Sequence, residues 1–488
     1  MASSNRVRIT MVRENTAGST PDTPRMRTAR WTGEALNIYT PTFVDGEEIN
    51  SDRMNDDPTE VFHDTNGPIN VDVSYPADLS PASEMLQSML MSSWTATPSR
   101  DNDGTADSVI TDIGTSAHVA TCTTGPAFVV GHLVQFSGNK DAPNNLIARC
   151  TTGSATVPAF SAVTFTADAA PAATSRMKAV GLQGVASDII ATSTGLGSTT
   201  LDFTTFNLQL GQTIKIGGTA TGDRFATAAL NTYATIAGIG ATALTLANLP
   251  AGWEPDAGTG KTIKVWFGDT MKNGLVQETL TIEKGFLDQT VPNFHVARGM
   301  TVNTYTETLA SKAKVKGVVN FMGMQGSKST TSLDATPDPV TTSKVFASNV
   351  NVGRVSEGGA LIAGPNFCKS LEWTISNNFQ AIEDITIDSP AGNVDGQCDV
   401  SAKFETYYGD STYIDKFFAG TPTSIHTVLY KNSQAITRHF PRLTYTGGGN
   451  PVASAKNTQV TLPLEAKASR DTLTGAQLIV DRLEYLEI

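Results

Sequence analysis

The chain has 488 residues, of which 39% are hydrophobic and only 17% charged, and its formal net charge is −12. This length allows several hydrophobic cores, and the low charge with 42 glycines favours β-sandwiches joined by tight turns over helical bundles. The acidic total argues against a basic nucleic-acid-binding face. The amino terminus does not resemble a secretory signal, and no apolar run reaches the roughly 20 residues of a membrane span, so we expect a soluble protein made in the cytosol.

The first 110 residues predict two strands and one helix. Residues 7–14 and 69–75 alternate apolar and polar side chains, which is typical of half-buried strands. A helix should follow, because Ser80 suits the N-cap and Pro81 suits the first helical position. Its apolar face has i, i+3, i+4, i+7 spacing and consists of Ala82, Met85, Leu86, Met89, Leu90 and Ser93.

Two long polar stretches, 37–66 and 326–345, match no regular element. The first carries eight acidic side chains among few apolar ones, and the second is rich in Ser, Thr and Pro. Loops of this length in a compact domain are either functional or disordered. The acidic side chains could ligate calcium, but the spacing of an EF-hand is absent, so a solvated loop or a partner contact is the favoured interpretation.

Residues 111–269 form a block of different composition. They contain nine acidic and eight basic side chains, so nearly all of the net negative charge belongs to the flanking blocks. The block also repeats itself at an offset of 80, where 130–138 corresponds to 210–218, and each copy has an asparagine further on, at Asn145 and Asn231. Two copies are too few for a solenoid, so the repeat predicts two tandem β modules.

The predicted organisation is a discontinuous core domain interrupted at a surface loop. Its two parts are 1–110 and 270–488, and the inserted modules are 111–182 and 183–269. After the insert, strands are expected at 275–286, 299–309 and 313–323.

No pattern for catalysis or metal binding is complete in this sequence. The run 258–262 (Gly-Thr-Gly-Lys-Thr) lacks the first glycine of a phosphate-binding loop, because Pro255 stands there, and a turn is favoured. The six histidines include no pair at i, i+4. Four scattered cysteines are best interpreted as small, reduced, buried side chains: Cys122, Cys150, Cys368 and Cys398. We therefore expect no enzyme, no cofactor and no metal.

The last 120 or so residues alternate apolar and polar side chains in short segments, the pattern of half-buried strands. These segments are an apolar run ending in Ser376-Asn377-Asn378, an aromatic hairpin at 404–408, Phe440-Pro441-Arg442-Leu443, and the closing stretch 461–468. None contains a nucleophile, a metal cluster or a phosphate loop. A chain of this kind is expected to form a surface rather than to run a reaction.

The order of these segments resembles that of tail tube proteins of long-tailed phages. The resemblance covers about 1–110 and 270–488. It rests on short motifs in series: Glu14-Asn15-Thr16-Ala17-Gly18, Ser51-Asp52-Arg53, Asn66-Gly67-Pro68-Ile69, the helix 81–93, Arg298-Gly299-Met300-Thr301-Val302-Asn303, Gly317-Val318-Val319-Asn320-Phe321-Met322-Gly323, the carboxyl-terminal segments above with Tyr407-Tyr408, and Leu464-Glu465-Ala466-Lys467-Ala468.

The resemblance implies a mainly β fold, with a β-sandwich core, one flanking α-helix and two inserted immunoglobulin-like modules on the outside. It implies the major tail tube subunit of a virion, forming hexameric rings that stack into a hollow tube. Expected partners are other copies, the tail tip, the terminator and the tape measure, while DNA passes through the lumen without specific binding. An acidic lumen would repel phosphates.

For the contacts between rings we favour the two polar stretches, with Asp45, Glu47, Glu48, Asp52, Arg53, Asp56 and Asp57 as candidate residues. Two alternatives remain open at this stage. The protein could be a connector or tail-tip subunit, which forms one ring and stops. It could also be an adhesin that binds through the 111–269 repeats, which would need an exposed aromatic platform.

Overall fold

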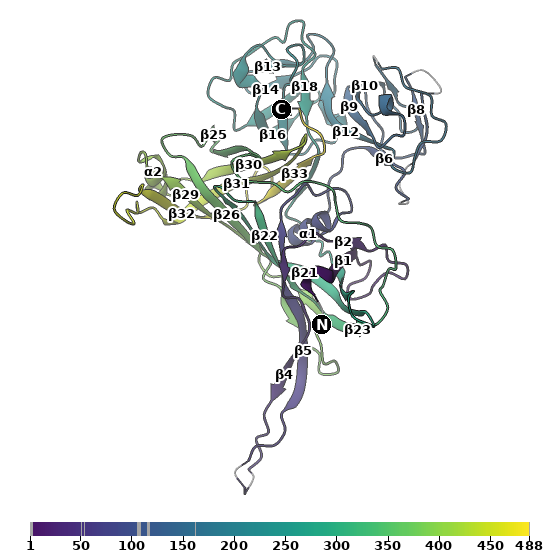
Figure 1. Cartoon of the computed structure of the whole chain (residues 1–488). Helices are drawn as coiled ribbons and strands as arrows, with labels where there is room; N and C mark the ends of the chain where they lie inside the picture. Colours follow the sequence, from purple (N-terminus) through teal and green to yellow (C-terminus); the bar gives the residue numbers. More distant parts are fainter. Residues whose placement is uncertain are drawn as a thin grey trace.

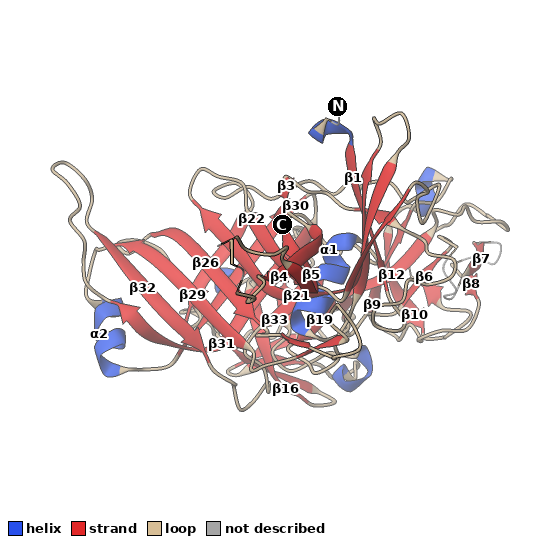
Figure 2. Cartoon of the chain, turned by 90° about the horizontal axis from the view of Figure 1, so that it is seen from below, coloured by secondary structure: helices blue, strands red, loops and turns tan. Residues whose placement is uncertain are grey.

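The computed structural model describes residues 3–49, 51–52, 54–104, 109–114, 118–161 and 163–487. Strands dominate this part of the chain and two α-helices accompany them (Figure 2). The predicted mainly β fold is therefore confirmed.

The largest sheet joins eighteen strands from both ends of the chain, and it forms the core of the molecule. Its strands are β1 (Val7–Arg13), β2 (Arg27–Thr28), β3 (Gly33–Glu34), β4 (Asn37–Val44), β5 (Thr59–Asp72), β19 (Asp269–Lys272), β20 (Leu280–Phe286), β21 (Asn293–Ala310), β22 (Lys316–Met322), β23 (Gln325–Ser329), β24 (Val352–Glu357), β25 (Ala360–Leu361), β26 (Cys368–Ser376), β29 (Asp399–Tyr407), β30 (Thr423–Lys431), β31 (Gln434–Gly448), β32 (Thr461–Ala468) and β33 (Ile479–Leu483).

This sheet folds back on itself into two packed layers. Layer A contains β5, β22, β21, β26, β29 and β32, and layer B contains β19, β33, β31, β30 and β24. The strand β31 belongs to both, because residues 435–439 pair with β33 and residues 443–448 pair with β32. Between the layers, Trp373 of layer A packs in one apolar cluster with Phe440 and Val480 of layer B. The core is therefore a β-sandwich.

The predicted helix is present as α1 (Pro81–Leu90). Ser80 is its N-cap and accepts a hydrogen bond from the Ser83 amide through its side chain. The helix ends before residue 93, because Met91 adopts a left-handed conformation with φ 49°. Met89 is completely buried against the sandwich, as its place on the apolar face predicts.

The aromatic hairpin predicted at 404–408 is wrong. These residues end β29, which pairs with β26 on one side and β32 on the other, and a second helix, α2 (Thr412–Ala419), follows. The carboxylate of Asp410 accepts a hydrogen bond from the Thr412 amide (2.9 Å) at the start of this helix, and Gly420 ends it at φ 59°. Its aromatic and β-branched residues gave no helical signal.

The prediction that 37–66 matches no regular element is also wrong. β4 and the first half of β5 pair as a long antiparallel hairpin, which we call the arm (residues 37–66). Figure 1 shows the arm extending away from the rest of the molecule. Both faces of its outer part are exposed, so burial imposes no apolar alternation there, and backbone pairing alone defines the strands.

The second polar stretch, 326–345, begins in β23 and then crosses the core without regular structure. It is held by partly buried contacts, since Arg30 donates to the carbonyl oxygens of Thr341 (2.6 Å) and Ser343 (2.7 Å). The Leu333 amide donates to Glu283 (2.6 Å). This stretch is therefore attached to the core, unlike the outer part of the arm.

The middle of the chain forms an eleven-stranded sheet and a small two-stranded one. The strands of the large sheet are β6 (Ser99–Asp101), β9 (His132–Ser137), β10 (Ile147–Thr152), β11 (Ala159–Phe160), β12 (Arg176–Gln183), β13 (Ile190–Thr192), β14 (Gly195–Gly197), β15 (Thr213–Ile216), β16 (Tyr233–Ile239), β17 (Ala243–Ala247) and β18 (Lys264–Trp266). The small sheet pairs β7 (Ile110–Ile113) with β8 (Ala120–Cys122).

The sequence repeat corresponds to repeated contacts. Asn145 clamps the backbone six residues before it, accepting from the Asn139 amide (2.9 Å) and donating to its carbonyl oxygen (3.1 Å). Asn231 does the same with Phe225, at 3.0 and 2.9 Å. Each half has its own apolar cluster, while β12 and β18 pair and make the sheet continuous between them. The four cysteines are free thiols, and burial raises the pKa of Cys150 to about 11.

Candidate assembly surfaces

The arm carries all the predicted inter-ring residues that the structure describes. Beyond the paired strands lies the acidic tip (residues 45–57), whose described residues are all exposed. The exposed carboxylates there are those of Asp45, Glu47, Glu48, Asp52, Asp56 and Asp57, whereas Arg53 lies outside the described residues. The sequence correctly located an exposed acidic segment, but it did not predict the hairpin that carries it.

Large apolar side chains also lie exposed along the arm. Phe43 is 53% exposed and Val61 49%, and Tyr39 lies beside them in the hairpin with its hydroxyl on Glu60. Ile49, in the tip, is 100% exposed. Exposed apolar residues gathered on a projecting element indicate a contact surface for another macromolecule.

A second, smaller hairpin lies against the arm. It is formed by β27 (Gln380–Ile382) and β28 (Gly392–Val394), and the His63 amide of the arm donates to the Asp388 carbonyl oxygen (2.8 Å) in the connecting turn. Ile385 in the same turn is fully exposed. The two hairpins together extend the apolar surface around the middle of the arm.

The outward face of layer A is polar, and its carboxylates are compensated. Alternate residues of β29 and β32 point away from the sandwich and are exposed. The contacts on this face are Lys403–Glu465 (3.9 Å), Lys467–Asp399 (2.8 Å), Lys369–Glu405 (2.8 Å), Lys314–Asp72 (2.7 Å) and a hydrogen bond from Thr308 to Glu372 (3.1 Å). The hydrogen bond from Lys369 lowers the pKa of Glu405. The face therefore presents hydroxyl groups and balanced charge.

The outward face of layer B is covered by the middle segment of the chain. Thr213 donates its amide to Asp481 (2.8 Å) and bonds His426 (3.0 Å) through its hydroxyl. An apolar cluster joins Trp266 of the insert to Val428 of layer B. The two outward faces of the sandwich are therefore unlike: one is open and polar, and the other is buried.

A buried ionic cluster joins the insert to the core. Lys178 of β12 donates to Asp269 (2.6 Å), and Arg482 of β33 donates to the same carboxylate (2.8 Å). Burial opposes ionisation of Asp269, but Lys178 and Arg482 outweigh it and lower its pKa. Sequence reasoning missed this cluster, because its members are spread over more than 300 positions and share no spacing.

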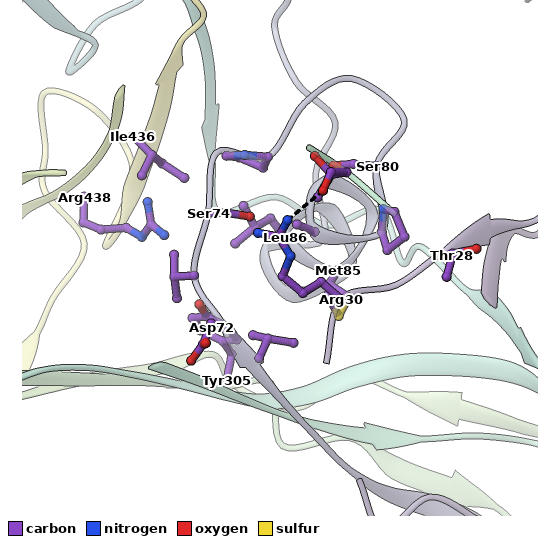
Figure 3. Close-up of a pocket in the computed structure, with 16 residues that line it drawn as sticks. Thr28, Arg30, Asp72, Ser74, Ser80, Met85, Leu86, Tyr305, Ile436 and Arg438 are labelled. Atoms are coloured by element: carbon purple, nitrogen blue, oxygen red, sulfur yellow. Dashed lines mark hydrogen bonds between the residues drawn. The ribbon is translucent and has the colours of Figure 1, made fainter. Parts of the chain in front are cut away.

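An enclosed cavity lies between α1 and the sandwich. Figure 3 shows Met85 and Leu86 of the helix on one side and Tyr305 and Arg438 on the other. Its lining is mainly apolar, and Arg438 is already paired with Glu307 (2.7 Å). The other two charged side chains of the lining are also engaged, Arg30 with the Thr341 and Ser343 carbonyl oxygens and Asp72 with Lys314 (2.7 Å).

Among the residues described, no group of three or more His, Cys, Asp or Glu side chains is placed to hold a metal ion. Within the same residues, no helix is both long enough and apolar enough to cross a membrane. The aromatic side chains that an adhesin would need to expose are buried or, for Trp253, half-buried: Phe128, Phe136, Phe160, Tyr233, Trp253, Trp266 and Phe267.

Comparison with known protein families gives a match. A family model described as "Phage tail tube protein" matches residues 218–468, just over half of the chain. The matched stretch begins in the insert, includes most of both sandwich layers and ends with β32. No curated protein matches the sequence.

Proposed function

Because the chain belongs to the phage tail tube protein family, we propose that it is the major tail tube subunit and polymerises as stacked hexameric rings into a hollow tube. The family makes it a phage tail structural protein and a component of the virion. The observation that carries the finer proposal is the arm, a hairpin whose outer part buries almost nothing within its own subunit.

The arm suits contact between successive rings. A projection that binds a different surface on the next copy is a heterologous contact, and such contacts continue into open-ended assemblies. Its exposed apolar residues and its acidic tip would be covered in the assembly, which explains why they remain exposed in one copy. The anchored stretch 326–345 is less suited to project into a neighbouring ring, because the core already holds it.

The outward face of layer A is the proposed lining of the channel. Four of its lysines are paired with carboxylates, which limits the release of counterions from DNA: Lys314, Lys369, Lys403 and Lys467. Lys316 is exposed and makes no ion pair with another described residue, so phosphate binding on this face is weakened but not abolished. The lining is thus compensated rather than acidic, which refines the lumen expected from the net charge. DNA would slide past hydroxyl groups and closed ion pairs during ejection.

With layer A facing the channel, the insert faces outward, because it covers the opposite face of the sandwich. The insert would then decorate the tube without entering the lumen. The buried ionic cluster fixes it to the core, so we expect one orientation for all copies. The subunit is made in the host cytoplasm and joins the tail tip, tape measure and terminator in the virion.

Negative-stain electron microscopy of the purified chain over a range of concentrations tests this function. Hollow tubes of stacked rings with outer knobs are the expected result. Single closed rings would favour the connector or tail-tip alternative. Chains that stay monomeric at high concentration, even with preformed tail tips added, would refute the tube function.

A further inference from the structure

A row of basic residues crosses three strands at the root of the arm. Lys284 of β20 pairs in register with His295 of β21, and His295 pairs in register with Lys328 of β23. Residues directly opposite one another in antiparallel strands point to the same face. The three side chains therefore form one line, which we call the basic row.

The basic row lines a groove beside the start of β4. The other wall is formed by Leu36, Ile38 and Tyr39. Gly326 allows β23 to approach this wall closely, because a Cβ at that position would collide with the Ile38 carbonyl oxygen. Figure 1 shows β23 beside the root of the arm, so the groove lies where the arm leaves the core.

The charge of the basic row is only partly compensated within one copy. Lys284 donates to Glu34 (3.1 Å) and to the Leu36 carbonyl oxygen (2.9 Å). Lys328 is exposed, and neither it nor the His295 ring makes a hydrogen bond or an ion pair with any other residue that the structure describes. Burial, and then Lys284 and Lys328, lower the pKa of His295. The lowered pKa leaves the His295 ring uncharged near neutral pH, so the exposed Lys328 ammonium is the charge of the row that no described carboxylate of the same copy balances.

We propose that this groove receives the acidic tip of the arm (residues 45–57) from a second copy of the chain in the adjacent ring. The inference rests on the proposed tube function and names the surface that the arm binds. The tip carries six carboxylates and one arginine, so its charge is complementary to the basic row. The structure describes all but two residues of the tip, and those it describes are exposed.

The length of the arm agrees with this docking. The arm extends about eleven residues from Ile38 at the groove to Ile49 in the tip, or roughly 35 to 40 Å at about 3.3 Å per residue. A copy shifted by that distance along the arm places its groove at the tip of the first copy. A chain cannot fill its own groove, because its arm points away from the root. The contact is therefore head-to-tail and repeats without closing.

Charge reversal at Lys328 tests the contact. Lys328→Glu should raise the concentration needed for tube formation by about tenfold or more, as measured by sedimentation and electron microscopy. The matched control is Lys456→Glu, the same change at an exposed lysine in another loop, which should assemble as wild type. Circular dichroism should show both variants folded, because both side chains are exposed.

Rescue makes the test specific. The tip variant Glu47→Lys with Glu48→Lys should also fail to assemble, while its combination with Lys328→Glu should recover tubes to within a few-fold of wild type. Raised salt should weaken wild-type assembly, since the contact is between charges. Normal assembly of Lys328→Glu, or no recovery in the combined variant, would overturn the docking and leave the tube function intact. Wild-type chains that never form tubes would instead refute the tube function itself.

Discussion

The buried pair of Glu307 and Arg438 between the two layers gives a sharp test of what holds the sandwich together. Their side chains are 0% and 1% exposed, and Arg438 donates to Glu307 at 2.7 Å. Tyr305 also donates to this carboxylate, at 2.9 Å. However, Glu307 Oε1 and Arg438 Nε make no hydrogen bond, so the pair is incompletely satisfied.

Arg438→Met should destabilise the core by about 3 to 5 kcal/mol, because it leaves an unpaired buried carboxylate. Adding Glu307→Leu should return the free energy of unfolding to the wild-type value or raise it above that value by roughly 1 to 4 kcal/mol. The reason is that two apolar side chains then replace two desolvated charges. Denaturant unfolding followed by tryptophan fluorescence suits the measurement, because Trp373 lies 5.7 Å from the Arg438 guanidinium and reports this region. This reasoning would be refuted if Arg438→Met lowered the free energy of unfolding by less than about 1 kcal/mol, or if the double variant were less stable than the single one.

Deleting 40–62 should leave a folded monomer with an unchanged unfolding midpoint but no tubes, and tubes of normal length from this deletion would exclude the arm from stacking. Asn145→Ala and Asn231→Ala should each cost about 1 kcal/mol in the insert by removing a two-bond backbone clamp, and unfolding of each variant measures this loss. Burial lowers the pKa of His439 to about 4, so the unfolded chain binds this proton first and stability should fall as pH drops from about 6.5 to 4. His439→Asn, which can still donate to the Gly211 carbonyl oxygen, should flatten that slope in unfolding titrations, and an unchanged slope would contradict it.

The parts of the fold that could be predicted from the sequence are those where burial of one face imposes a regular spacing of apolar residues. The helix cap at Ser80 and the alternating strand 461–468 were predicted because one face of each element enters the core. The arm was missed for the opposite reason: its outer strands bury neither face, so no periodicity records them. Its acidic composition still indicated an exposed segment.

The insert–core junction could not be predicted, because it depends on residues that meet only after the chain has folded. In the sequence, Lys178 is an ordinary lysine within a predicted strand, and Asp269 is the last residue of the nearly neutral block 111–269. In the structure the two form a buried ion pair. The basic row could not be predicted from the sequence either. Lys284, His295 and Lys328 become neighbours through strand register, which the sequence does not give.

The two outward faces of the sandwich explain how the chain accommodates a large insertion. In layer B, the insert buries the face that would otherwise be open, and the closing strand β33 contributes Asp481 and Arg482 to its attachment. In layer A, the facing carboxylates stay exposed because each has a partner within the same copy. The arm exposes both acidic and large apolar side chains. In the proposed tube, a domain added on layer B would therefore not obstruct growth along the arm.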